Sequence, residues 1–281
     1  MKRALLIIGS IVLIVIAATG IWFWNGYREF TKVEIVKLDP QLTIYLGGGG
    51  NSIVLTSEDR TEALVVDTKM GGAANDLKES VTAKRITVVN THSHFDHAGG
   101  NDLFPNAKII AGAYTPEQWE NDSDGSRKPD VMLKPGEETR LRIGNESVLV
   151  RNMGRAHTMN DVVVYLEKRK LLAAGDLVFL NMHPALSHKF GTSLDSWLAA
   201  LGRLGTLYDI KTLVPGHGPV SDKNAIITMK EYFISIRDVI GDREKLEALK
   251  KKYAAYGSLP FMTGFHYTTM FLEGGEKRET K

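Results

Sequence analysis

The sequence contains no cysteine among its 281 residues. This absence excludes disulfide bonds, thiolate-bound zinc and a cysteine nucleophile. A concentrated basic region is also lacking, because 35 lysines and arginines are balanced by 33 aspartates and glutamates, for a net charge of +2. Proteins that bind nucleic acid usually carry such a region, so we expect no nucleic-acid partner. The composition, with 43% hydrophobic and 24% charged residues, predicts a globular protein.

An uncharged segment of 21 residues, residues 4–24, follows the basic pair Lys2 and Arg3. As a helix it would extend ~30 Å, which is the thickness of the hydrocarbon core of a bilayer. A cleaved secretory signal has a shorter apolar core and ends in small residues, whereas this segment ends in tryptophan. We therefore expect residues 1–27 to be an uncleaved anchor that crosses the cell membrane once, with the body on the outer side. Cleavage would instead release a secreted protein.

Strand-like and helix-like segments are interspersed in the body, which we assign to residues 28–256, ahead of a C-terminal tail at 257–281. The run "TIYLGGGGNSIVLTS" predicts two strands joined by a turn at residues 47–50, and "RITVVN" predicts a buried strand. A phosphate-binding loop is not expected at the four glycines, because no G-K-[ST] follows them. "SLDSWLAALGRLGTLY" has the apolar spacing of an amphipathic helix. This mixture favours a layered α/β architecture.

Three of the eight histidines lie within six positions of the stretch "THSHFDHAGG", residues 91–100. His92, His94, Asp96 and His97 directly follow a predicted strand, and a helix is expected to start at His97. Imidazole and carboxylate are the groups that bind divalent transition metals when thiolate is absent. The alternative is a polar surface loop that is rich in histidine. So short a stretch cannot surround one ion and leave an open coordination position, so we expect further ligands elsewhere.

Three further candidate ligands lie where a predicted apolar strand meets a loop. They are His157 after "VLVRNMGRA", Asp176 at the end of "KLLAAGD" and His217 at the end of "TLVPGH". In α/β sheets, ligands gather at such strand ends. Each residue alone would be an ordinary turn or capping residue. Together with the histidine-rich stretch, they make seven ligand-type side chains in four segments.

The order H-x-H-x-D-H, then a histidine, an aspartate and "GHG", resembles the metallo-β-lactamase superfamily of hydrolases over residues 35–222. The resemblance implies a four-layer αββα sandwich, here preceded by one transmembrane helix, with a dinuclear metal site at one edge. One ion would bind His92, His94 and His157, the other would bind Asp96, His97 and His217, and Asp176 would bridge both. It also implies that Asp67 orients the histidine loop and that Asn51 borders the pocket.

The resemblance implies a reaction as well. Water between two divalent ions loses a proton near neutral pH and attacks a carbonyl carbon, and Asp96 would orient it. The ligand set with Asp176 is similar to that of glyoxalase II-type thioesterases and of lactonases, so we expect a small-molecule ester, thioester or lactone as substrate. The expected cofactors are two zinc ions, with iron or manganese as alternatives. A β-lactam is the first alternative substrate, followed by a phosphodiester and by an iron-dependent redox reaction.

Three histidines remain outside this set. His183 and His188 follow Asp176 closely, and we expect ordinary loop roles for them, with a place in the pocket as the alternative. The sequence identifies no partner for His266 or for the neighbouring Tyr267.

Overall fold

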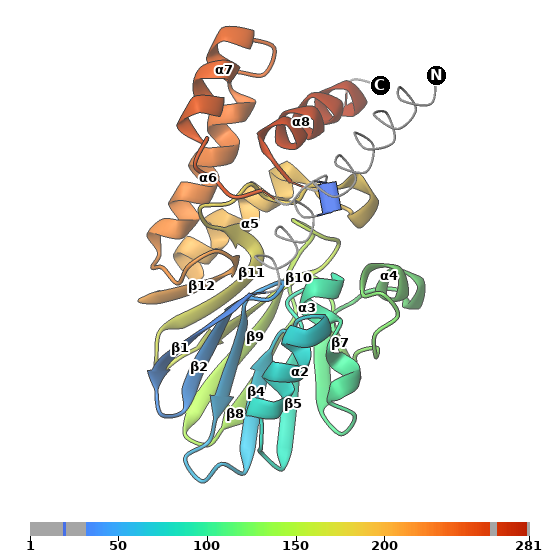
Figure 1. The fold of residues 1–281 in the computed structure, drawn as a ribbon, viewed down its shortest axis with the longest axis vertical. Coiled ribbons are helices and arrows are strands. Elements are labelled where there is room, and N and C mark those ends of the chain that lie inside the picture. Colours follow the sequence, from blue (N-terminus) through green and yellow to red (C-terminus); the bar gives the residue numbers. More distant parts are fainter. Residues whose placement is uncertain (1–18, 21–31, 259–262, 280–281) are drawn as a thin grey trace, which may run out of the picture.

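The computed structural model describes residues 19–20, 32–258 and 263–279, and it shows two stacked β-sheets with helices on their outer faces (Figure 1). Within these ranges the first sheet has seven strands, whose order in space follows the chain: β1 (Val33–Asp39), β2 (Leu42–Gly47), β3 (Ser52–Thr56), β4 (Glu62–Val66), β5 (Arg85–Val89), β6 (Lys108–Gly112) and β7 (Val131–Leu133). Strands β1 to β4 pair antiparallel, and β4 to β7 pair parallel.

The second sheet has five strands in the described part of the chain. Their order in space is β12 (Thr212–His217), β11 (Leu171–Phe179), β10 (Asp161–Leu166), β9 (Glu146–Gly154) and β8 (Glu138–Ile143). Strands β8 to β11 pair antiparallel, whereas β12 lies parallel to β11. A parallel neighbour needs a crossover connection, and helix α5 supplies it here.

The helices of the described residues are mostly short. They are α2 (Gly71–Ser80), α3 (Phe95–Ala98), α4 (Pro116–Asp122), α5 (Leu194–Leu207), α6 (Asn224–Arg237), α7 (Arg243–Lys252) and α8 (Phe265–Glu279), with 3-10 turns η1 (Asn101–Leu103) and η2 (His188–Phe190). Helix α4 begins with a capping box, in which the Thr115 hydroxyl accepts from the Gln118 amide while the Gln118 side chain accepts from the Thr115 amide.

Three apolar cores separate the layers. Leu64 and Val89 of the first sheet pack against Val148 and Val164 of the second sheet. Leu77 of α2 belongs to a second core on the outer face of the first sheet. The third core lies between the second sheet and helices α5 and α6. The predicted α/β sandwich with two sheets and outer helices is confirmed.

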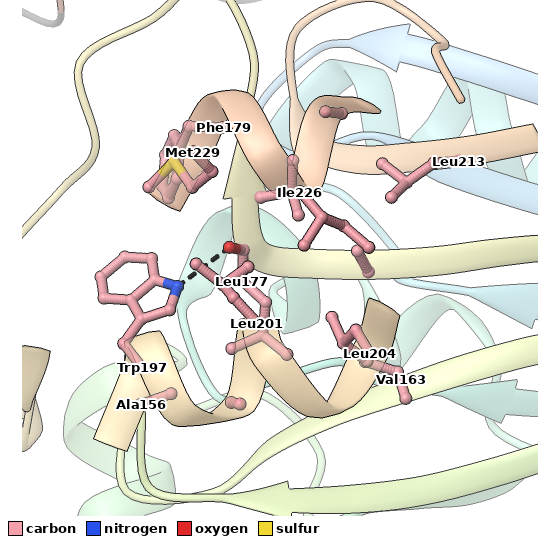
Figure 2. Close-up of a cluster of buried hydrophobic side chains, with 14 of the residues drawn as sticks. Ala156, Val163, Leu177, Phe179, Trp197, Leu201, Leu204, Leu213, Ile226 and Met229 are labelled. Atoms are coloured by element: carbon pink, nitrogen blue, oxygen red, sulfur yellow. Dashed lines mark hydrogen bonds between the residues drawn. The ribbon is translucent and has the colours of Figure 1, made fainter. Parts of the chain in front are cut away.

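Helix α5 has the buried face that its apolar spacing predicts. Trp197, Leu201 and Leu204 have no exposed surface, and Figure 2 shows them pointing toward β11 and α6. The Trp197 indole nitrogen donates to the Leu177 carbonyl at 2.9 Å, the bond drawn dashed in Figure 2. A buried N–H without a hydrogen-bond partner would destabilise the fold, and this bond removes that cost for the Trp197 side chain. Helix α5 is thereby fixed to the strand that carries Asp176.

One helix start differs from the sequence expectation, and two further expectations concern the ends of the chain. The helix expected to start at His97 starts at Phe95, since His94 keeps extended backbone angles just before it. The tail expected at 257–281 contains α8, whose Leu272 joins the core of α5 and α6. Across the described ranges, no helix is both long and apolar enough to cross a membrane. The predicted anchor at 1–27 lies outside the described residues apart from residues 19 and 20, and it stays a prediction.

Candidate metal centre

The seven candidate ligands come from four segments of the chain and converge at one edge of the sandwich. His92 and His94 lie in the loop after β5, and Asp96 and His97 lie on α3. The others are His157 in the loop after β9, Asp176 in β11 and His217 at the end of β12. The structure therefore brings together all seven residues that the sequence singled out.

Asp176 lies inside β11 and not at its end, which corrects the expectation from the sequence. The pairing of β11 with β12 explains why a residue inside β11 can reach the site. Between two paired positions β11 advances four residues, from Gly175 to Phe179, while β12 advances only two. This bulge turns the Asp176 side chain toward the histidines. The adjacent Gly216 leaves room for it, because a Cβ there would lie 1.9 Å from Oδ1 of Asp176.

Asp67, which directly follows β4, holds the histidine loop as predicted. Its Oδ1 accepts from the Thr91 amide at 2.7 Å. Its Oδ2 accepts from the Thr91 hydroxyl at 2.8 Å and lies 2.7 Å from Nδ1 of His97. A carboxylate at Nδ1 fixes the orientation of the ring, so that Nε2 of His97 points away from Asp67. The contacts therefore present Nε2 of His97 to the centre of the site.

The ligand atoms form two groups. In the first group are His92, His94, His157 and Asp176, and in the second are Asp96, His97 and His217. Within each group the ligand atoms lie within 4.8 Å of one another.

Asp176 connects the two groups. Its Oδ2 lies 3.3 Å from Nε2 of His157 and 3.8 Å from Nε2 of His92. Its Oδ1 lies 3.1 Å from Nε2 of His97 and 3.5 Å from Nε2 of His217. One carboxylate therefore presents a different oxygen to each group.

The spacing of these atoms fits metal ions. Ligand atoms ~2.1 Å from a tetrahedral ion are ~3.4 Å apart. Nε2 of His157 lies 3.1 Å from Nδ1 of His94. In the second group, Nε2 of His97 lies 3.4 Å from Nε2 of His217. Nε2 of His92 and Oδ1 of Asp176 are buried and have no hydrogen-bond partner among the described residues. Since buried polar atoms are almost always satisfied, this donor set fits a divalent ion in each group.

Comparison with known proteins assigns this arrangement to a family. A sequence model described as "Metallo-beta-lactamase superfamily" matches residues 45–217, which include all seven candidate ligands. The chain belongs to the metallo-beta-lactamase superfamily. The family resemblance in the order of the ligands is thereby confirmed.

Individual relatives in the superfamily are similar to this chain over part of their length. Metallo-beta-lactamase IND-1 of Chryseobacterium indologenes is 33% identical over 135 residues, which are 47% of this chain and 55% of the relative. Metallo-beta-lactamase type 2 of Bacillus sp. (strain 170) is 28% identical over 163 residues, 57% of this chain and 63% of the relative. The chain thus spans less than two thirds of these two relatives.

A solved metallo-beta-lactamase from Pontibacter korlensis shares the fold. It matches with a TM-score of 0.61 and 24% identity, covering 71% of this chain and 98% of that one. At this level of identity the likeness concerns the fold alone.

Burial and mutual charge set the protonation of the site. Burial lowers the pKa of His157 to about 3, although the Asp176 carboxylate opposes the shift. For Asp96, burial raises the pKa, but His97 and His217 outweigh it and hold the pKa at about 2. At neutral pH, His157 is therefore a neutral imidazole and Asp96 is an ionised carboxylate. These are the forms in which the two side chains bind metal.

Lys69 is a structural residue that the sequence reasoning missed. It is fully buried, and its ammonium donates to the carbonyls of Tyr45, Gly47 and Gly50, at 2.9 Å for Tyr45 and 2.8 Å for Gly50. Burial lowers the pKa of Lys69 to about 7. The three bonds hold the predicted turn at residues 47–50 against the histidine loop. One feature of the sequence could have revealed the buried position of Lys69: it is a single lysine two residues after Asp67, at the end of a buried strand.

Asn51 does not border the pocket, contrary to the expectation from the resemblance. Its Oδ1 accepts from the Gly47 amide at 2.9 Å. Its Nδ2 donates to the carbonyls of Pro215 and Gly218 at 2.9 and 2.8 Å. The side chain instead ties the glycine turn to the end of β12, next to His217.

A cavity of about 280 Å³ opens beside the two ligand groups. Five of the seven candidate ligands line it, and Asp176 and Asp96 are among them. The apolar residues that line it, here named the apolar wall, are Phe95, Phe179, Ala185, Leu186 and Phe190. None of the wall residues was expected from the sequence, because the segment after β11 contributes most of them, and it has no recognisable motif.

The remaining histidines lie outside the cavity lining, in agreement with the loop roles expected for two of them. His183 is buried and its Nδ1 hydrogen-bonds with the Tyr232 hydroxyl at 2.7 Å. The ring of His188 stacks on Phe271 of α8, with ring centroids 4.2 Å apart. His266 is exposed on α8.

Proposed function

We propose that the protein is a metal-dependent hydrolase that uses two divalent ions, zinc in the first instance, to cleave an ester, thioester or lactone. The observation that carries the proposal is the position of Asp176 between the two ligand groups, with one oxygen toward each. A single-ion site would not need a second group of three ligands. Iron and manganese favour the same donor types and remain alternatives to zinc.

The residues of the site have distinct tasks in this reaction. His92, His94 and His157 would hold one ion, Asp96, His97 and His217 would hold the other, and Asp176 would hold both. Two ions held in this way supply an acidified water as nucleophile and polarise the carbonyl oxygen. Asp96 faces the cavity as an ionised carboxylate, so it would accept a hydrogen bond from the attacking water and orient it. Asp67 fixes the orientation of the His97 ring through its contact with Nδ1.

A β-lactam is the second candidate substrate, because the similar proteins from Chryseobacterium and Bacillus are named metallo-beta-lactamases. A phosphodiester is less well supported. Enzymes that act on nucleic acid usually add cationic side chains that contact the neighbouring phosphates, and neither lysine nor arginine is found among the described residues that line the cavity.

The proposal is tested with the full chain, purified in detergent and loaded in turn with zinc, iron or manganese. Its substrates are an aliphatic lactone, a thioester, nitrocefin and bis-p-nitrophenyl phosphate. We expect turnover of the lactone or the thioester that chelation abolishes and metal restores. His92→Ala should be inactive, and His266→Ala, which changes an exposed histidine outside the site, should match the wild type. Faster turnover of nitrocefin would establish the second candidate, and failure of all four substrates would overturn the hydrolase proposal.

A further inference from the structure

Most of the apolar wall belongs to residues 183–192, which come after β11 and are here named the wall segment. This segment supplies Ala185, Leu186 and Phe190 to the cavity. The Phe190 ring packs edge-on against His94 of the first ligand group, with ring centroids 4.6 Å apart. The position of the wall segment therefore sets the room that a substrate has beside this ligand group.

One side of the wall segment is attached to the loop that carries His157. The Thr192 hydroxyl donates to the His157 carbonyl at 2.7 Å, and it accepts from the Ser187 amide at 3.1 Å. The Arg155 guanidinium donates to the Gly191 carbonyl at 2.6 Å. These bonds join the wall segment to the first ligand group.

The other side of the wall segment is attached to α8. The rings of His188 and Phe271 stack with their planes at 19°. Nδ1 of His183 hydrogen-bonds with the Tyr232 hydroxyl at 2.7 Å, and this hydroxyl lies 3.1 Å from the Thr268 hydroxyl of α8. The three side chains of this hydrogen-bonded chain are buried. Helix α8 therefore supports the wall segment at two points.

The wall segment depends on such side-chain contacts for its position. Apart from the short turn η2, it contains no helix or strand. Backbone without regular hydrogen bonds opens locally at a low free energy, so the contacts of its side chains decide how firmly it is held. Phe271 is only partly buried, so its replacement by alanine leaves a smaller cavity than a change in the centre of a core.

We propose that α8 is a specificity element of the hydrolase. Through Phe271 and Thr268 it holds the wall segment in place, and the wall segment limits the size of the apolar substrate group that lies beside His94. This inference rests on the hydrolase function proposed above. Because α8 supplies none of the seven candidate ligands, loosening it moves the wall and leaves both ions in place. The attraction of the ions for the substrate is then equal in the wild type and in the α8 variants, and only the fit of the apolar group differs.

The test uses the metal-loaded full chain and a series of lactones, and a matched series of thioesters, whose alkyl substituents increase in size. We expect Phe271→Ala to raise KM for the smallest substrate at least threefold, because the wall no longer closes around it. Its kcat should stay within a factor of two, because the ions stay in place. The ratio of kcat/KM for the largest substrate to that for the smallest should rise at least threefold.

Met270→Ala is the matched control on the same helix. Met270 is exposed, and its replacement should change neither KM nor the size preference. Both variants are also analysed for bound metal by mass spectrometry, and each should hold as many ions as the wild type. Loss of metal from Phe271→Ala would show that α8 supports the ligands and would overturn a role confined to the wall.

Two further variants test whether α8 acts through the contacts described. His188→Ala removes the other ring of the stack, so the double variant with Phe271→Ala should change the size preference no more than either single variant. Additive effects would contradict the stack as the route. Thr268→Val keeps the shape of a buried side chain and removes its hydroxyl beside Tyr232. It should shift the size preference in the same direction, and it provides the test if Phe271→Ala does not fold.

The outcomes separate the inference from the function on which it rests. An unchanged size preference in Phe271→Ala, or in Thr268→Val where Phe271→Ala does not fold, would overturn the inference and leave the hydrolase function standing. No turnover of any lactone or thioester by the wild type would overturn the proposed function, and the inference with it.

Discussion

Asp176→Asn is expected to lower kcat/KM by more than about 100-fold, which exceeds the 10- to 100-fold loss typical of residues that only support a ligand. The physical reason is that one carboxylate contacts both ligand groups, through Oδ2 on His157 and through Oδ1 on His97. An amide keeps the shape of the side chain but removes its negative charge, and its nitrogen cannot bind an ion. Steady-state kinetics on the best lactone or thioester measures the loss.

The matched control for this change is Asp195→Asn. Asp195 is exposed at the start of α5, and within the described part of the chain its ion pair is with Arg237, at 3.5 Å. Its replacement should leave kcat/KM within a factor of two of the wild type. If Asp176→Asn retained more than a tenth of the activity, a bridging position for Asp176 would be wrong.

Gly50→Ala is expected to destabilise the fold by ~1–3 kcal/mol and to reduce turnover at least tenfold. A Cβ at this position would lie 2.2 Å from Cε1 and 2.3 Å from Nε2 of His97. Neither partner can yield easily. The His97 ring is fully buried and fixed by Asp67, and the turn is held by Lys69. Because Nε2 of His97 is a candidate ligand atom, any shift that relieves the clash also disturbs the second ligand group.

The same substitution at Gly202 is the control for Gly50→Ala. Gly202 lies in the interior of α5, and a Cβ there would meet nothing within 4 Å. Alanine favours a helix over glycine by ~1 kcal/mol, so Gly202→Ala should stabilise the protein and leave its activity unchanged. Chemical denaturation followed by circular dichroism gives both changes in the free energy of unfolding. Equal stability and activity of Gly50→Ala and the wild type would show that the turn does not press on His97.

The candidate ligands could be picked out from the sequence because each of them is local to a recognisable pattern. Asp96 and His97 belong to a six-residue cluster behind a buried strand, and Asp67 closes an apolar run. We expected these segments to meet because each follows the end of a strand. They do meet at one edge of the sandwich, where Asp67 contacts Nδ1 of His97. What could be predicted was therefore which side chains meet at the candidate metal centre.

The surroundings of the ligands could not be predicted, for reasons that lie in the tertiary structure. Asp176 reaches the site through a bulge that depends on pairing between β11 and β12, which no local pattern reveals. Lys69 reads as a surface residue until the glycine turn folds over it. Phe179 and Phe190 belong to a strand end and a 3-10 turn, and only the fold makes them one wall. The residues that line the cavity beside the candidate ligands are therefore the ones that could not be predicted from the sequence.

The metal content of the full chain tests most directly whether seven side chains form two sites. The protein is incubated with excess zinc, freed of loosely bound ions by gel filtration, and analysed by inductively coupled plasma mass spectrometry against its concentration. The two ligand groups joined by Asp176 predict two ions per chain. A content of one ion or none would contradict a dinuclear centre.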